Sequence, residues 1–166
     1  VGENAKMLSE LVPNGKVFAI DVHKDLLEHL ETDILKEKKN QEKRNVEGKG
    51  DLDVEVKLQN IVPVWGDIEN MDGSRLRDDS IDAILISNTF FLLIHKKTCM
   101  LEMKRVLKKK GKILFVDWHK GLGKAAHQKE QMLHEQDIEN LFTEIDMKVF
   151  PLVHKDDNHF VLVIEK

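Results

Sequence analysis

Two aspartates stand at the ends of two short apolar runs. Residues 16–20 lead into Asp21, and residues 61–65 lead through Gly66 into Asp67. Apolar runs of this length are typical of buried strands, and an open α/β sheet binds its ligands beyond the carboxyl ends of such strands. The pattern therefore predicts a ligand site at which both carboxylates can accept hydrogen bonds.

The distance from Asp21 to a glycine narrows the class of ligand. Asp21 lies 19 positions after Gly2, and roughly 20 residues separate a glycine-rich nucleotide turn from the acidic residue that holds a ribose. This spacing indicates a nucleoside cofactor, although Gly2 is the only glycine of such a fingerprint in the chain. The alternative is a carboxylate that caps the turn or the helix after the strand. The residues alone leave both interpretations open.

Composition excludes several classes of protein. The chain has 166 residues, of which 41% are hydrophobic, so we expect one domain with a sizeable core. Its net charge of −4 offers no general attraction for nucleic acid. A single cysteine, Cys99, excludes an intrachain disulfide and favours a reducing, cytoplasmic location. No run approaches the roughly 18 apolar residues of a membrane span.

The elements that position the two aspartates alternate along the chain. Turn residues and hydrophobic periodicity predict helices at 3–11, 95–107 and 137–145, and a further helix whose apolar face carries Leu26, Leu27, Leu30 and Ile34. They predict strands at 16–21, 61–65, 81–87, 112–116, 148–153 and 159–165. Gly111 is predicted to supply a left-handed cap after the third helix. The last two strands are too close in sequence for a parallel crossover. We predict an α/β fold with a mostly parallel, Rossmann-like sheet, helices on both faces and a C-terminal antiparallel hairpin.

Residues 36–53 differ in composition from the rest of the chain. They are rich in Lys, Glu, Asn, Gln and Gly, and we interpret them as a frayed helix end and a charged mobile loop. The lysines raise a nucleic-acid hypothesis, but glutamates interrupt them and no aromatic residue is present to stack on a base. A solvated surface is the favoured interpretation, so we expect no nucleic-acid partner.

Five stretches carry a resemblance to a known family. The order and motifs of the chain resemble the class I S-adenosylmethionine-dependent methyltransferases, in particular the small-molecule branch that includes quinone-biosynthesis enzymes. The resemblance covers nearly the whole chain and implies methyl transfer from S-adenosylmethionine to a small-molecule acceptor. The stretches are GKVFAID (15–21), GDIEN (66–70), DDSIDAILISN (78–88), EMKRVLKKKGK (102–112) and LFVDW (114–118).

The resemblance assigns the nucleoside part of the cofactor to the first two strand ends. It implies that Asp21 accepts hydrogen bonds from both ribose hydroxyls and that Val22 packs on one face of the adenine. Asp67 would accept a hydrogen bond from the adenine amino group, and Ile68 would help to cover the ring. A carboxylate for hydroxyl donors and apolar contacts for a flat base are physically suited to these roles.

The resemblance also assigns roles to the end of the strand at 81–87 and to the start of the chain. Ser87 and Asn88 end the fourth strand of the family, where backbone groups contact the methionine part of the cofactor. Gly2 would be the last glycine of the family's glycine-rich loop, and the family's first strand would precede Val1. We therefore expect residues 1–166 to be a single methyltransferase-like domain, truncated at its N-terminus.

The acceptor side is predicted from the segments after the fourth and fifth strands of the family. Phe90, Trp118 and His119 are the candidate substrate-binding residues. His119 has an imidazole suited to proton transfer, while the alternative is an exposed loop histidine. Methyl transfer needs alignment more than a strong base, so no catalytic residue is assigned. The histidines show no recognised metal spacing, and no metal is expected.

Two other classes of function remain open. An NAD-dependent oxidoreductase would share the acidic end of the first strand, but gives no reason for Gly66-Asp67. A non-catalytic methyltransferase-like binding protein or subunit would be consistent with the missing glycine loop. An Asn-Pro-Pro-aromatic motif, typical of methylation of nucleic-acid bases, is absent where Ser87-Asn88-Thr89-Phe90 stands. This favours a small-molecule acceptor, and a homodimer is left open.

Overall fold

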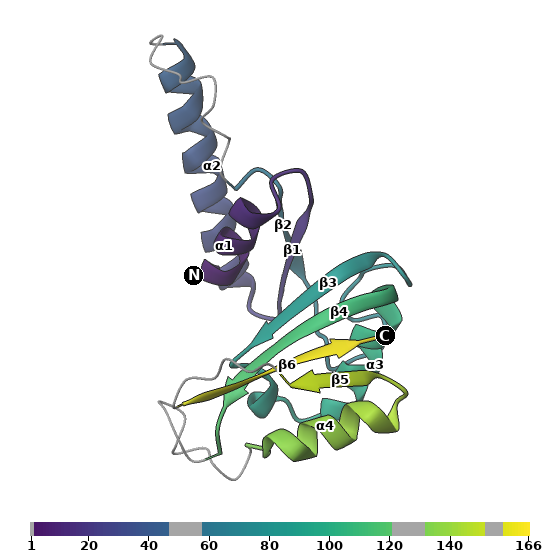
Figure 1. The fold of residues 1–166 in the computed structure, drawn as a ribbon. Coiled ribbons are helices and arrows are strands. Elements are labelled where there is room, and N and C mark those ends of the chain that lie inside the picture. Colours follow the sequence, from purple (N-terminus) through teal and green to yellow (C-terminus); the bar gives the residue numbers. More distant parts are fainter. Residues whose placement is uncertain (1, 47–57, 121–131, 152–157) are drawn as a thin grey trace. The chain divides into compact units, whose positions relative to one another are not determined.

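The structure is a computed structural model, and it describes residues 2–46, 58–120, 132–151 and 158–166. The chain divides into two compact units, Val1–Asp67 and Ile68–Lys166, whose elements are labelled in Figure 1. Each unit is described by itself. The expected single domain stays a prediction.

The first unit is a two-stranded parallel sheet with two helices. β1 (Val17–Asp21) pairs with β2 (Ile61–Trp65), so that Asp21 lies opposite Trp65. α1 (Glu3–Leu11) and α2 (Lys24–Val46) pack on the same face of this sheet. Their shared core contains Ala5, Val17, Leu30 and Ile61. The predicted helix at 3–11 and both predicted strands are confirmed.

α2 is longer than the sequence pattern predicts. It continues to Val46, so residues 36–46 are helical where the sequence analysis expected a frayed helix end and a charged loop. Residues 47–53 of that expected loop lie outside the described residues. Figure 1 shows residues 36–46 of α2 extending beyond β1 and β2. The last apolar residue packed on the core of this unit from α2 is Ile34. Beyond it, Lys, Glu, Gln and Arg sustain the helix because their helix propensities are close to that of Leu.

The second unit is a four-stranded sheet in the order β3-β4-β6-β5. β3 is parallel to β4, while β6 lies antiparallel between β4 and β5 (Figure 1). The predicted C-terminal antiparallel hairpin and the α/β fold class are therefore confirmed. The elements are β3 (Ile81–Ser87), the short 3-10 helix η1 (Phe90–Leu92), α3 (Lys96–Val106), β4 (Leu107–Trp118), α4 (Glu135–Glu144), β5 (Lys148–Pro151) and β6 (His159–Glu165).

The core of the second unit lies between its sheet and the helices α3 and α4. Phe115 on β4 is fully buried, and its ring centroid lies 5.1 Å from that of Phe90 and 6.0 Å from that of Phe142. The neighbouring Leu114 points to the other face of the sheet and is 40% exposed. Period-2 alternation thus gives β4 one buried face, and both helices cover that face.

Gly111 has a different role from the predicted helix cap. α3 passes directly into β4 at Leu107, and the left-handed residue nearby is Lys110, with φ of 65°. Gly111 lies within β4, where the register against β3 shifts between Ile81 and Ala83. A Cβ atom at Gly111 would lie 2.8 Å from the Lys108 carbonyl oxygen and 3.2 Å from that of Asp82. The glycine is needed because two backbone segments approach it closely.

Gly111→Ala is expected to destabilise the protein by about 1–3 kcal/mol, because overpacking against rigid backbone forces the strand to move. Urea unfolding followed by circular dichroism measures this change. Gly15→Ala is the matched control, since a Cβ atom there would meet its nearest neighbour at 3.4 Å. Equal unfolding midpoints for the two variants would contradict the close-approach explanation.

A buried carboxylate holds the chain between β2 and β3 against α3. Glu102 is 1% exposed, and its two oxygens accept the backbone N–H groups of Ser74 (3.1 Å) and Asp72 (3.0 Å). Arg105 adds hydrogen bonds of 2.8 and 2.7 Å. Burial alone would raise the pKa of Glu102, but the hydrogen bonds from Arg105 and Ser74 outweigh it and lower the pKa to about 2.

Candidate cofactor site

Asp21 uses one carboxylate oxygen to form a turn. Its Oδ1 accepts the backbone N–H of His23 at 2.9 Å and lies 2.9 Å from Nδ1 of the same residue. The capping interpretation is therefore confirmed for this oxygen. Oδ2 makes no hydrogen bond within the part of the chain that the structure describes, and the side chain is 39% exposed. Asp21 thus combines a structural contact with one oxygen that remains open to a ligand.

Trp65 fixes the residue after Asp21 and was missed by the sequence analysis. Its indole N–H donates to the Val22 carbonyl oxygen at 3.1 Å, and the Lys24 ammonium lies 4.2 Å from the centre of its ring. Val22 itself is 48% exposed, so its side chain presents apolar surface beside Asp21. The signal available in the sequence was an aromatic residue at the last position of a strand, directly before Gly66-Asp67.

The ends of β1 and β2 are joined by a backbone hydrogen bond. Gly66 is buried and donates its N–H to the Asp21 carbonyl oxygen at 3.1 Å. The predicted pair Asp21 and Asp67 therefore follows two adjoining strand ends, as the sequence pattern predicted, and Asp67 is half-buried. The carboxyl edge of this sheet carries two acidic groups from separate parts of the chain.

Gly2 lies at the N-terminus of α1. Its φ of 70° is left-handed, and a Cβ atom there would lie 2.8 Å from Cδ1 of the buried Leu30. A short turn joins α1 to β1, so the start of the helix and the end of the strand lie at the same end of the unit. The left-handed backbone and the close approach of Leu30 explain why a glycine stands at position 2. The contact of Gly2 with a cofactor stays a prediction.

In the second unit, Asn88 has an unusual environment. It follows β3, adopts a left-handed φ of 53°, and donates its N–H to the Val116 carbonyl oxygen at 2.9 Å. Its Oδ1 atom is buried without a hydrogen-bond partner among the described residues. A buried acceptor left unpaired costs about 1–3 kcal/mol, so the surrounding structure must hold Asn88 in this position. The backbone contact with the cofactor that the sequence analysis predicted here stays a prediction.

Three other residues of this unit were predicted to contact the cofactor or the substrate. Ile68 packs against the core, and Ser87 accepts a hydrogen bond from Thr89 at its carbonyl oxygen. Phe90 is 1% exposed and belongs to the core, so its predicted role as a substrate contact is not carried forward. Its position in the run Phe-Phe-Leu-Leu-Ile is explained by packing.

Trp118 and His119 lie at the carboxyl end of β4 and are half-buried. The Trp118 ring centroid lies 3.9 Å from that of His159, and the His119 ring lies 5.7 Å from Phe160. Both side chains are thus held by aromatic neighbours on β6. The proton-transfer role of His119 stays a prediction.

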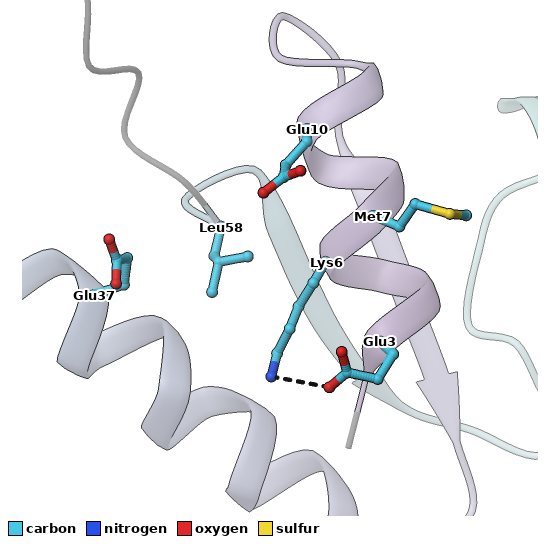
Figure 2. A pocket seen from close by; sticks show the side chains of 6 residues that line it. All are labelled: Glu3, Lys6, Met7, Glu10, Glu37 and Leu58. Atoms are coloured by element: carbon cyan, nitrogen blue, oxygen red, sulfur yellow. Dashed lines mark hydrogen bonds and ion pairs between the residues drawn. The ribbon is translucent and has the colours of Figure 1, made fainter.

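A cavity of about 430 Å³ in the first unit shares no residue with the predicted site. Figure 2 shows its lining, which includes Glu3, Lys6 and Glu10 from α1 and Glu37 from α2. Lys6 is bound by Asp33 at 3.0 Å and by Glu3 at 3.5 Å, and the hydrogen bond to Asp33 raises its pKa despite partial burial. The ion pair links the two helices, and the cavity is open and acidic, so no cofactor role is assigned to it.

Two searches of the described residues gave no candidates. Among them, no group of three or more His, Cys, Asp or Glu side chains is arranged to hold a metal ion. None of the helices in the described ranges is long and apolar enough to cross a membrane.

The comparison with known families decides the assignment. The sequence matches the family described as a methyltransferase domain over residues 3–160. The chain belongs to this family. The methyltransferase prediction is therefore confirmed. None of the curated proteins compared matches the sequence.

Solved structures share the fold of this methyltransferase domain. A S-adenosylmethionine-dependent methyltransferase from Aquifex aeolicus is 22% identical, with a TM-score of 0.70 over 96% of this chain and 73% of that one. The YcgJ protein from Bacillus subtilis is 12% identical, with a TM-score of 0.63 over 92% and 82%. An arsenic(III) S-adenosylmethionine methyltransferase from Chlamydomonas reinhardtii is 17% identical, with a TM-score of 0.60 over 98% and 57%. At these identities the likeness concerns the fold.

Proposed function

We propose that this methyltransferase domain transfers a methyl group from S-adenosylmethionine to a small-molecule acceptor. One observation carries the proposal, namely that Asp21 keeps Oδ2 open at a strand end whose turn is fixed by His23 and Trp65. A carboxylate held in place and half-exposed is suited to ribose hydroxyls because its geometry is set before the ligand arrives.

The residues of the first unit suit the nucleoside part of the cofactor. Asp21 would accept the ribose hydroxyls through Oδ2, and the exposed Val22 would contact the adenine ring. Asp67, at the adjoining strand end, would accept a hydrogen bond from the adenine amino group. Gly2 would approach the cofactor through its backbone. In the second unit, backbone groups of Ser87 and Asn88 would contact the methionine part, and Ile68 would help to cover the adenine.

The chemistry asks the protein mainly to align its ligands. S-adenosylmethionine supplies a methyl group on a sulfonium, which is an excellent leaving group. The chain's own residues would therefore orient the acceptor and exclude water, without a strong base. On the acceptor side we propose Trp118 and His119, whose rings are held against β6. No catalytic residue is proposed.

The acceptor is proposed to be a small molecule. Ser87-Asn88-Thr89-Phe90 follows β3 where base-methylating enzymes carry Asn-Pro-Pro-aromatic, and the net charge of −4 gives no attraction for a polyanion. The single cysteine favours a reducing compartment, so we place the protein in the cytoplasm.

Trp65→Phe is expected to weaken S-adenosylmethionine binding about fivefold, because loss of the indole N–H releases the Val22 carbonyl and costs about 1 kcal/mol. Isothermal titration calorimetry measures the change. Lys24→Met, which removes the cation over the ring but keeps the hydrogen bond, is the control. Equal affinities for Trp65→Phe and the unchanged protein would rule out a role for this hydrogen bond.

A non-catalytic binding function is the second candidate. β1 and β3 each pair on one side only among the described strands, and an open strand edge is a template for another chain. A second copy of the chain or a partner subunit could pair with such an edge. Size-exclusion chromatography with light scattering tests this function: a stable complex without cofactor binding would favour it.

Calorimetric titration with S-adenosylmethionine, and separately with NAD, tests the proposed function. Saturable binding of S-adenosylmethionine alone would support it and justify a screen of acceptors for methyl transfer. Binding of NAD alone would favour an oxidoreductase instead. Binding of neither ligand to folded protein would contradict both enzyme hypotheses.

A further inference from the structure

A turn joins α1 to β1 and contains the one Asn-Gly pair of the sequence. Residues 12–15 are Val-Pro-Asn-Gly, and the Gly15 N–H donates to the Val12 carbonyl oxygen at 2.9 Å. This is the hydrogen bond of a β-turn, and the second position of such a turn favours the fixed φ of proline. Asn14 is therefore the third residue of the turn, and Gly15 is the last.

Both residues of the pair are open to solvent. Asn14 and Gly15 are exposed, as are their neighbours in the turn. The Asn14 amide makes no hydrogen bond with any residue that the structure describes, so its side chain can rotate toward the next peptide group. Gly15 carries no side chain to shield its nitrogen, and a Cβ atom there would meet its nearest neighbours, atoms of Val12, at 3.4 Å.

The hydrogen bond of the turn gives the Gly15 nitrogen little protection. The Val12 carbonyl oxygen has a second donor, because Nδ2 of Asn60 lies 2.8 Å from it. A carbonyl oxygen has two lone pairs, so it stays paired with Asn60 when the Gly15 N–H is released. The exposed Gly15 N–H then passes to water. Neither group is left unsatisfied, so opening this bond is inexpensive.

We propose that Asn14 is a site of spontaneous deamidation in the folded protein. The Gly15 nitrogen attacks Cγ of Asn14, so that an N–Cγ bond forms and the Cγ–Nδ2 bond breaks. Nδ2 leaves as ammonia, together with the proton that the Gly15 nitrogen loses. The product is a succinimide ring, and water is the reactant that opens it.

Two products follow from the two carbonyl carbons of the ring. Water that attacks Cγ gives aspartate and the normal main chain. Water that attacks the main-chain carbonyl carbon of the same residue gives isoaspartate, in which the main chain runs through Cβ and Cγ. Neither step changes an oxidation state. Each product has a carboxylate in place of the amide, so the net charge of −4 becomes more negative by one charge.

Two other asparagines show what the turn contributes. Asn60 is held by hydrogen bonds with Ser9 and Val12, so its side chain is not available to rotate. Asn4 is exposed, but it lies in α1 and precedes Ala5. A Cβ atom on the following residue restricts the backbone and hinders approach of its nitrogen. Exposure alone is therefore not expected to make an asparagine reactive.

Peptide mapping by mass spectrometry tests the proposal after incubation of the folded protein in mildly alkaline buffer. Trypsin cleaves after Lys6 and Lys16, and residues 7–16 contain Asn14 as their only amide side chain. Two deamidated forms of this peptide are expected, and Asn14→Asp supplies the chromatographic standard for one of them. The peptide that ends at Lys6 contains Asn4 and is expected to react at least about tenfold more slowly, which corresponds to about 1.4 kcal/mol in the barrier.

A variant tests the requirement for glycine. Gly15→Ala is expected to slow the reaction at least about tenfold, because the methyl group hinders the attacking nitrogen. Lys16→Arg is the matched control, since it changes the next exposed residue and keeps both the Asn-Gly pair and the tryptic site. Its rate is expected to equal that of the unchanged protein.

The unchanged protein in urea shows what the fold contributes and needs no variant. Because the turn is exposed and its hydrogen bond opens easily, the folded and unfolded rates at Asn14 are expected to agree within about tenfold. A folded rate lower than this would overturn the inference, since the turn would then protect the pair. Equal rates at Asn4 and Asn14, or an unchanged rate in Gly15→Ala, would overturn it as well.

Discussion

Asp21→Asn is expected to raise the Kd for S-adenosylmethionine about 100-fold. Hydrogen bonds to a charged acceptor contribute about 1.5–3 kcal/mol each, and about 3 kcal/mol corresponds to a 100-fold change in affinity. Asparagine keeps an oxygen for the His23 N–H, so the turn should survive. The loss then reports the negative charge offered to the ribose. Isothermal titration calorimetry of both proteins measures it.

The control variant for this prediction removes the imidazole of His23, which lies beside the Asp21 carboxylate. His23→Ala deletes the contact of Nδ1 with Asp21 but leaves the backbone N–H in place. We expect its affinity to remain within about threefold of the unchanged protein, since a contact between exposed side chains is weak. If Asp21→Asn also bound within threefold, the carboxylate would have no part in ribose recognition.

Glu102→Gln is expected to lower the free energy of unfolding by about 3 kcal/mol. The pKa of Glu102 falls from 4.5 to about 2 on folding, and each pKa unit corresponds to about 1.4 kcal/mol. The substitution also leaves Arg105, which is 14% exposed, without its buried carboxylate partner. Urea unfolding at neutral pH measures the change, with Glu144→Gln on the exposed surface of α4 as the control.

The same group sets a pH dependence with a defined sign. Because folding lowers its pKa, the contribution of Glu102 is fully present above pH 4.5 and is lost as the pH falls toward about 2. The unchanged protein should therefore lose stability across this window more steeply than Glu102→Gln does. Parallel pH profiles for the two proteins would show that Glu102 is not held ionised by Arg105 and Ser74.

Local sequence signals predicted most elements of the fold. The apolar runs at 61–65 and 81–87 give strands with these bounds, because a buried strand leaves a short, uninterrupted hydrophobic signal. The four-residue polar turn before His159 excluded a parallel connection. Each of these features depends on neighbours in the sequence, and such features can be read without tertiary information.

Two local interpretations differ from the structure, for different reasons. The charged residues at 36–46 resemble a loop by composition, yet their helix propensities let them continue a helix whose Leu30 and Ile34 pack on the core of the first unit. Gly111 was placed as a helix cap because it follows the end of the helix predicted at 95–107. Its function is steric, and it depends on the carbonyl of Asp82 on another strand.

The candidate site divides in the same way. The types and spacing of Gly2, Asp21 and Asp67 indicated by themselves a nucleoside-binding edge, since strand ends and their carboxylates are local features. Only the tertiary structure decided which Asp21 oxygen is open and that Phe90 belongs to the core. It also decided that Glu69, Lys96 and Asp117 all bind the backbone of residues 91–95. Partners of a backbone group come from distant parts of the chain, and no sequence period records them.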